Sequence, residues 1–178
     1  MKVKKTNKLQ LSNDDLLRYN KHILLEEIQT DGLEILKQKH AAIIGLGGLG
    51  CPVAQYLSTS GFGKITLIDH DVVEETNLQR QILYTSEDLG LYKTDVACKR
   101  LKVLNPDINI QGYNIRFTNN SIHLMKDVDV IIDATDNFES RSLINEISLL
   151  LKKPLVMGAA IKMQGQVAVF RNDLCDMP

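Results

Sequence analysis

The chain has 178 residues, a formal net charge of −1 and 44% hydrophobic residues. This length suits one domain with a single core, and the near-neutral charge excludes a global attraction to nucleic acid or to an anionic membrane. No apolar run approaches the roughly 18 residues of a membrane span. We therefore expect a cytoplasmic protein without nucleic-acid or membrane partners.

Four lysines fall within the first eight residues, with no apolar segment after them. This pattern does not fit a signal peptide, and we expect residues 1–11 to form a flexible basic N-terminus before a domain at 12–178. The three cysteines, Cys51, Cys98 and Cys175, are far apart and odd in number. They predict neither a disulfide framework nor a C-x-x-C zinc pair, and we expect Cys51 and Cys98 to be buried thiols on helices.

Short apolar runs alternate with helical patterns along the chain. The pattern starts with a capping box at Ser12–Asp15, which predicts a short helix ending near Tyr19, and Asp31-Gly32 is expected to be a turn before another short helix at 33–36. Further helices are expected between Gly50 and Gly61 and at residues 94–104, 120–125 and 138–151. Strands are expected at residues 40–44, 64–68, 108–115, 128–132, 155–157 and 166–170.

This rhythm predicts an α/β fold, Rossmann-like and doubly wound, with a mainly parallel sheet and short N-terminal helices. Ligands of such folds bind outside the carboxyl ends of the strands, where the winding reverses. Segments 45–50, 69–71 and 133–136 each follow a predicted strand. We therefore expect them to share one crevice.

The most conspicuous of these segments is glycine-rich. Gly45, Gly47 and Gly50 fit the G-x-G-x-x-G spacing, and Gly48 adds a fourth glycine. Such a turn between a strand and a helix lets backbone N–H groups approach a phosphate, although it can also be purely structural. Asp69, 24 residues after Gly45, is placed to bind a ribose.

The long connection between residues 69 and 94 carries a dense set of polar groups. A dinucleotide enzyme would leave them without a role, whereas an ATP-using enzyme needs cations for about four phosphate charges in a partly desolvated cleft. Arg80 and Lys93 would supply this charge. Asp136, and with it Asp133, could hold a magnesium ion that bridges phosphates.

Seven motifs occur together in order and spacing. They are Arg18-Tyr19-Asn20, Gly45–Gly50, Asp69-His70-Asp71, Asn77-Leu78-Gln79-Arg80-Gln81, Gly90-Leu91-Tyr92-Lys93, Ala134-Thr135-Asp136-Asn137 and Gly158-Ala159-Ala160. In these motifs the chain resembles the ThiF/MoeB/HesA family, the bacterial relatives of ubiquitin-activating enzymes. The resemblance runs from about residue 14 to the end of the chain, and the segment 77–81 is its most diagnostic part.

The resemblance implies ATP- and Mg²⁺-dependent adenylylation of the C-terminal glycine of a small ubiquitin-fold sulfur carrier, MoaD-like or ThiS-like, which ends in Gly-Gly. Pyrophosphate is released. The catalytic residues implied are Arg80, Lys93 and Asp136, with Asp136 as the magnesium ligand and Asp133 as a further candidate. The nucleotide-binding residues implied are Gly45, Gly47, Gly48, Gly50, Asp69, Asp71, Asn77, Arg80, Gln81 and Lys93.

Two departures from the family pattern matter. Many members form homodimers in which an arginine reaches into the partner's triphosphate site, and here Lys21 stands at that position, with Arg18 nearby. Lysine keeps the charge but loses the bidentate fork. The chain also ends before the family's zinc-binding C-x-x-C segment and crossover loop, so we expect no zinc, no thioester cysteine and an exposed sheet edge at 166–170.

Three functions therefore stay open. The first is the adenylyltransferase, acting in molybdenum cofactor, thiamine or another sulfur pathway. The second is a non-catalytic nucleotide-binding or dimerising subunit of the same fold. The third is an NAD(P)-dependent oxidoreductase, which the polar segment 77–81 disfavours.

Overall fold

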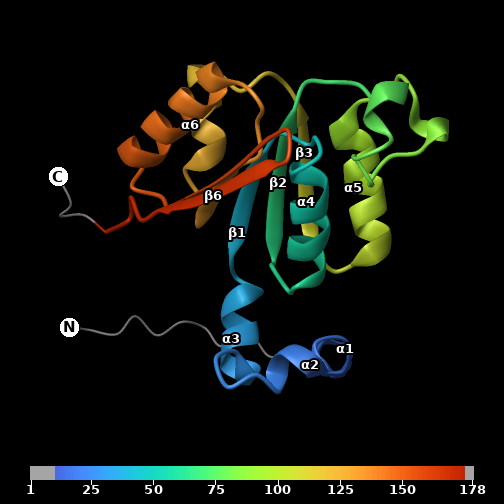
Figure 1. Ribbon diagram of the computed structural model, residues 1–178. Helices are drawn as coiled ribbons and strands as arrows, with labels where there is room; N and C mark the ends of the chain where they lie inside the picture. Colours follow the sequence, from blue (N-terminus) through green and yellow to red (C-terminus); the bar gives the residue numbers. More distant parts are fainter. Residues whose placement is uncertain (1–10, 175–178) are drawn as a thin grey trace.

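A six-stranded sheet with the order β3-β2-β1-β4-β5-β6 forms the centre of the computed structural model, which describes residues 11–174 (Figure 1). The strands are β1 (His40–Ile44), β2 (Lys64–Asp69), β3 (Asn109–Asn114), β4 (Val130–Asp133), β5 (Leu155–Ile161) and β6 (Gln164–Phe170). β1 to β5 are parallel, and β6 pairs with β5 in the antiparallel direction. The predicted Rossmann-like fold is confirmed.

Helices cover both faces of the sheet. The α-helices are α1 (Asn13–Arg18), α2 (Asn20–Ile23), α3 (Gln29–Leu36), α4 (Gly50–Thr59), α5 (Lys93–Leu104) and α6 (Phe138–Leu150), and the 3₁₀ helices are η1 (Glu75–Asn77), η2 (Ser86–Asp88) and η3 (Asn119–Met125). α4 and α5 pack on one face, and α6 and η3 pack on the other (Figure 1). Within residues 11–174, the helices are too short or too polar for a membrane span.

The central strand β1 divides the core between these two layers. Ala41 and Ile43 pack toward α4 and α5, while Ala42 and Ile44 pack toward α6 and η3. All four side chains are buried because a strand in the middle of a covered parallel sheet has no solvent face. A continuous apolar run is therefore the correct sequence signal for this strand.

The N-terminal helices contain one confirmed prediction and one that is wrong. The Ser12 hydroxyl accepts a hydrogen bond from the Asp15 backbone N–H, and the Asp15 carboxylate accepts one from the Ser12 N–H, as a capping box requires. The predicted turn at Asp31-Gly32 lies inside α3 instead. The chain turns earlier, at Gln29 with φ +52°, and a Cβ at residue 32 would approach Ile28 Cγ2 to 3.2 Å, so glycine suits close packing here.

His40 and Asp129, at the amino ends of the strands, both have hydrogen-bond partners within the chain. His40 places Nε2 at 2.8 Å from the Thr66 hydroxyl and Nδ1 at 3.1 Å from the Asp127 carbonyl. Asp129 accepts hydrogen bonds from the Lys39 ammonium and the His40 backbone N–H. Burial lowers the pKa of His40, and the charge of Lys64 acts in the same direction.

The last hairpin forms one edge of the sheet. Strands β5 and β6 are longer than predicted, because only two residues, Lys162 and Met163, separate them and Lys162 adopts φ +52°. β6 has a strand on one side only, and its Val167 and Val169 side chains are 77% and 61% exposed. The expected exposed edge at 166–170 is present.

Candidate functional site

A cavity of about 750 Å³ opens at the carboxyl ends of the strands, beside the point between β1 and β4 where the winding reverses. Its lining comes from the segments after β1, β2, β3 and β4, from the connection that contains residues 80–93, and from the β5–β6 hairpin. Of the predicted site residues, it brings together Gly45, Gly47, Gly48, Asp69, Asp71, Arg80, Gln81, Lys93 and Asp136. The expectation of one shared crevice is confirmed for these segments.

The glycine turn forms the floor of this cavity. Gly45 has φ +92°, and a Cβ on it would lie 2.8 Å from the Ala134 carbonyl oxygen. Gly50 begins α4, and a Cβ there would lie 2.0 Å from the Gly45 carbonyl oxygen. At Gly47, by contrast, the nearest atom to a Cβ is Gln81 Nε2 at 3.8 Å. Two glycines therefore permit the fold, while the absence of a side chain at residue 47 leaves the floor open.

Three side chains hold the peptide groups at Leu46 within this turn. The Asp69 carboxylate accepts a hydrogen bond from the Leu46 N–H at 2.6 Å and another from the Asp71 N–H at 2.8 Å. The Tyr84 hydroxyl and the Cys51 thiol both donate to the Leu46 carbonyl, at 3.0 and 3.3 Å. Burial raises the pKa of both Cys51 and Tyr84, so both remain protonated donors at neutral pH.

The connection after β2 positions Arg80 and Gln81 above the floor. A Cβ at Gly48 would approach Arg80 Cδ to 3.3 Å, so the arginine stem lies against the glycine turn. Gln81 is 3% exposed and lines the cavity, yet its Oε1 has no hydrogen-bond partner. Asn77 does not line the cavity: its Oδ1 accepts from the Glu74 N–H, and its carbonyl accepts from the N–H groups of Arg80 and Gln81.

Lys93, which is buried, is held by Asp71. Its ammonium lies 2.8 Å from Asp71 Oδ2, and its backbone N–H donates to the Asp71 carbonyl at 3.0 Å. Partial burial opposes ionisation of Asp71, but the Lys93 hydrogen bond and charge outweigh it, with help from His70 and Arg116, and lower its pKa. Asp71 thus holds the lysine at the cavity wall.

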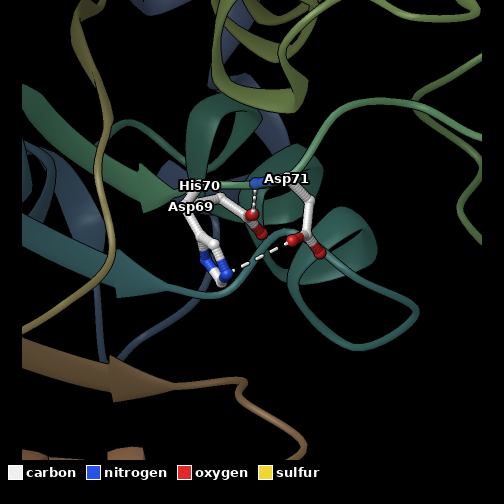
Figure 2. A group of neighbouring side chains, drawn as sticks. All are labelled: Asp69, His70 and Asp71. Atoms are coloured by element: carbon white, nitrogen blue, oxygen red, sulfur yellow. Dashed lines mark hydrogen bonds and ion pairs between the residues drawn. The ribbon is translucent and has the colours of Figure 1, made fainter.

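Asp69, His70 and Asp71 also form a compact group at the end of β2 (Figure 2). His70 Nε2 lies 3.5 Å from Asp71 Oδ1. Their ligand atoms are close enough to hold a metal ion. However, both Asp69 oxygens accept backbone N–H groups and Asp71 already binds the Lys93 ammonium, so most of the negative charge has partners.

The two candidate magnesium ligands lie in different environments. Asp136 is exposed and lines the cavity. Asp133 is 1% exposed, does not line the cavity, and accepts from the Thr135 N–H and hydroxyl through Oδ1, while Oδ2 has no partner. Burial raises the pKa of Asp133, although Thr135 and the charge of Arg141 oppose this. Asp136 fits a metal that contacts a bound ligand better than Asp133 does.

Three basic residues of the lining were missed by the sequence reasoning. Arg141 donates to the Thr135 carbonyl at 2.7 Å and to the Gly158 carbonyl at 3.4 Å, so it joins the loop after β4 to β5. His70 and Arg116 follow β2 and β3, and they contact each other at 3.1 Å. The sequence signal for both is their position just after a parallel strand, because residues there lie near the crevice in such folds.

Arg18 and Lys21 do not line the cavity of their own chain. Arg18 donates to the Leu104 carbonyl at the end of α5, and Lys21 is exposed on α2. Any contribution of these two residues to a triphosphate site would have to come from another copy of the chain.

The residues present fit ATP and Mg²⁺. The open floor at Gly47 leaves room for phosphate oxygens, and Arg80 and Lys93 stand beside it as donors. The buried Oε1 of Gln81, which has no hydrogen-bond partner among the described residues, is an acceptor available to a hydroxyl or N–H group of a bound nucleotide. Asp136 offers the hard oxygen ligand that Mg²⁺ prefers beside phosphates.

A doubly wound sheet with a glycine turn, a carboxylate at the end of β2 and basic groups at its switch point is the arrangement typical of the class of nucleotide-binding folds. Residues 19–175 match the ThiF family, and the chain belongs to that family.

Two curated relatives show which proteins the chain is similar to. The chain is 42% identical over 165 residues to the sulfur carrier protein adenylyltransferase of Thermus thermophilus, covering 92% of this chain and 61% of the relative. It is 42% identical over 162 residues to the adenylyltransferase and sulfurtransferase MOCS3 of Anopheles gambiae, covering 90% and 37%. The chain thus spans less than two thirds of the length of these relatives.

Solved structures agree with this fold. The crystal structure of PaaA superposes with a TM-score of 0.83 at 26% identity, covering 98% of this chain and 57% of that chain. The E. coli tRNA N6-threonylcarbamoyladenosine dehydratase TcdA, in complex with ATP, superposes with a TM-score of 0.78 at 27% identity, covering 86% and 65%.

Proposed function

We propose that the chain forms the ATP-using part of an adenylyltransferase that activates the C-terminal glycine carboxylate of a small ubiquitin-fold sulfur carrier. The observation that carries this proposal is the convergence of Arg80, Lys93 and Asp136, from three separate segments, on one cavity with the glycine turn. The 42% identity to a sulfur carrier protein adenylyltransferase, against 27% to a tRNA-modifying dehydratase, supports this substrate class.

The reaction needs little covalent chemistry from the protein. A carrier carboxylate oxygen attacks the α-phosphorus of ATP, the bond from that phosphorus to the bridging oxygen breaks, and pyrophosphate leaves with the electron pair. The product is an acyl-adenylate. Bound Mg²⁺ would withdraw charge from the phosphates, with Asp136 as its protein ligand.

The remaining residues act by position and charge. Asp69 accepts from the ribose hydroxyls while it keeps the turn closed through Leu46, and the N–H groups at the start of α4 face the phosphates. Arg80 and Lys93 stabilise the charge that moves toward the leaving pyrophosphate. Asp71 holds Lys93 at the cavity wall through the 2.8 Å contact between its carboxylate and the ammonium.

ATP–pyrophosphate exchange in the presence of a carrier that ends in Gly-Gly tests this proposal. Asp136→Asn should reduce exchange by about 10²–10³-fold, as is typical for the loss of a group that stabilises transition-state charge. Asp107→Asn, an exposed aspartate before β3 and away from the cavity, is the matched control and should keep wild-type exchange.

Two results would replace the proposal with another function. ATP binding without any exchange would support a non-catalytic nucleotide-binding subunit. A rise in melting temperature with NADH but not with ATP and Mg²⁺ would support an oxidoreductase, because a specific ligand at 100 times its Kd stabilises by about 2.7 kcal/mol.

The proposal also includes a homodimer in which Arg18 or Lys21 assists the partner's site. Both residues are remote from their own cavity, which supports a role in trans. An equal mixture of Lys21→Ala and Asp136→Asn chains should recover part of the exchange activity that neither variant has alone. No recovery would count against assistance between subunits.

A further inference from the structure

Asp133 is a buried carboxyl group that takes no direct part in the proposed reaction. It ends β4, is 1% exposed and does not line the cavity, so it is out of reach of a ligand there. Its Oδ1 accepts from the Thr135 N–H at 2.9 Å and from the Thr135 hydroxyl at 2.6 Å, while Oδ2 has no partner among the described residues. Burying a carboxyl group with an unpaired oxygen is unfavourable, and an apolar residue would complete β4 without this penalty.

Thr135, the partner of Asp133, is held from its other side by Arg141. The Arg141 guanidinium donates to the Thr135 carbonyl through Nη2 at 2.7 Å and through Nε at 3.3 Å. Thr135 itself is 9% exposed and lines the cavity. The N–H, the hydroxyl and the carbonyl of this one residue are therefore all fixed by two side chains, one from β4 and one from α6.

The loop is fixed again immediately after Asp136. Asn137 caps α6, because its Oδ1 accepts from the Ser140 N–H at 2.9 Å and its carbonyl accepts from the Arg141 N–H at 3.3 Å. The Asp136 carboxylate is exposed and has no hydrogen bond or ion pair within residues 11–174. Its place at the cavity therefore depends on the backbone, which Thr135 and Asn137 hold on either side.

We propose that Asp133 is a positioning residue, which acts through Thr135 to hold Asp136 where it can bind the Mg²⁺ that accompanies ATP. This inference rests on the proposed function, in which Asp136 is the metal ligand. Removal of a group that orients a metal ligand typically weakens metal binding by about 10–100-fold. A positioning role accounts for a polar residue at the last position of a buried strand.

The dependence of ATP affinity on Mg²⁺ measures this role. Isothermal titration of ATP into the 178-residue chain, once with Mg²⁺ and once with EDTA, gives two Kd values, and their ratio is the Mg²⁺ enhancement of binding. Thr135→Val removes the hydroxyl that donates to Asp133 and should reduce the enhancement by about tenfold, with an unchanged Kd in EDTA. Asp133→Ala should reduce it further, because both contacts are lost, and Thr135→Val keeps the proposal testable if Asp133→Ala does not fold.

A double variant and two conservative variants test the contact itself. Asp133→Ala combined with Thr135→Val should match Asp133→Ala alone, because both substitutions remove the same interaction. Thr135→Ser and Asp133→Asn keep the donor and the acceptor, and each should retain the enhancement to within about twofold of wild type. A tenfold loss in both conservative variants, as estimated above for a lost contact, would overturn the proposal.

Thr66→Val is the matched control for damage to the fold. Thr66 is 2% exposed, and its hydroxyl lies 2.8 Å from His40 Nε2, away from the cavity. This variant should lower the melting temperature, as Thr135→Val does, but leave the Mg²⁺ enhancement unchanged. An equal loss of the enhancement in Thr66→Val would mean that general destabilisation is the cause, which would overturn the positioning role.

The failures of the two proposals are distinguishable. If the wild-type chain does not bind ATP with Mg²⁺, the proposed function is wrong, and the positioning role with it. If Asp136→Asn keeps the full enhancement, Asp136 is not the metal ligand and the inference is overturned, while the use of ATP stands. If Asp136→Asn loses the enhancement but Thr135→Val and Asp133→Ala keep it, the positioning role alone is wrong.

Discussion

At the amino ends of β1 and β2, both ring nitrogens of His40 have hydrogen-bond partners, and Asp129 accepts from a lysine and from a backbone N–H. At the carboxyl ends of the same sheet, Gln81 Oε1 and Asp133 Oδ2 are buried and have none. Both ends bury polar atoms, so burial alone does not distinguish them. The difference between these four groups is that His40 and Asp129 have partners within the chain, whereas Gln81 Oε1 and Asp133 Oδ2 have none among the described residues.

An orphaned buried polar atom costs about 1–3 kcal/mol, and native proteins tolerate it chiefly where a ligand or function requires it. The His40 and Asp129 pairs at the amino end therefore contribute stability, while Gln81 at the carboxyl end lines the cavity with an acceptor available to a ligand. If this division holds, substitutions at the two ends should separate folding from nucleotide binding.

The largest effect on stability is expected from Gly50→Ala. The new Cβ would lie 2.0 Å from the Gly45 carbonyl oxygen, so the helix must move away from the turn at a cost of about 3 kcal/mol. Gly90→Ala is the control, because Gly90 has φ +80° but nothing within 4 Å, and strain alone should cost about 1 kcal/mol. Urea denaturation measures both, and equal losses would contradict the steric explanation.

Gly47→Ala should separate phosphate binding from folding stability. A Cβ at this position has no atom nearer than 3.8 Å, so stability in urea should stay within about 0.5 kcal/mol of wild type. The methyl group would nevertheless occupy the cavity floor. Titration should show loss of tripolyphosphate binding from a fully folded protein, and intact binding would mean that phosphates do not approach Gly47.

Arg141→Ala should have an intermediate effect. The substitution leaves the Thr135 and Gly158 carbonyls without the guanidinium donor, so we expect the free energy of unfolding to fall by about 1–2 kcal/mol. Because the loop with Asp136 adjoins these carbonyls, we also expect weaker binding of ATP and Mg²⁺. Arg171→Ala is the control, since Arg171 is exposed and pairs with Asp173 two residues away, and its melting temperature should match wild type. A destabilised Arg141→Ala with normal ATP affinity would limit Arg141 to a structural role.

The smallest effect should appear as a pH dependence at the amino end. Because burial lowers the pKa of His40 below its ordinary 6.5, the unfolded chain binds a proton more readily than the folded chain. Stability should therefore fall as the pH drops below about 6.5, by at most about 1.4 kcal/mol per pH unit. Urea denaturation of His40→Gln between pH 7 and 5 should show a shallower dependence, and an unchanged slope would exclude His40 as its source.

The sequence predicted most of the fold because buried parallel strands leave a simple signal. Continuous apolar runs located β1 and β4, and the capping box located α1. The prediction of a turn at Asp31-Gly32 was wrong. Gly32 packs closely against Ile28 inside a helix, and the sequence alone does not distinguish such a glycine from one that turns the chain.

Predictions for the site were accurate where a residue's place follows from strand ends. Asp69 and Asp136 line the cavity as expected. The inward direction of Asp133 and the capping contact of Asn77 depend on side-chain direction, which spacing does not encode. Arg141 acts from the first turn of α6 onto two carbonyl groups, and a contact to backbone atoms leaves no residue-type signal.

The hydrogen bond from the Cys51 thiol to the Leu46 carbonyl makes the glycine turn observable by thiol chemistry. Cys51 is fully buried beneath the turn, so a labelling reagent reaches it only when this part of the chain opens. In a variant whose other two cysteines are replaced by serine, the labelling rate of Cys51 measures how often this opening occurs. This labelling rate should fall as a larger fraction of the protein binds nucleotide. It therefore measures ligand occupancy without catalytic turnover and without an added fluorophore.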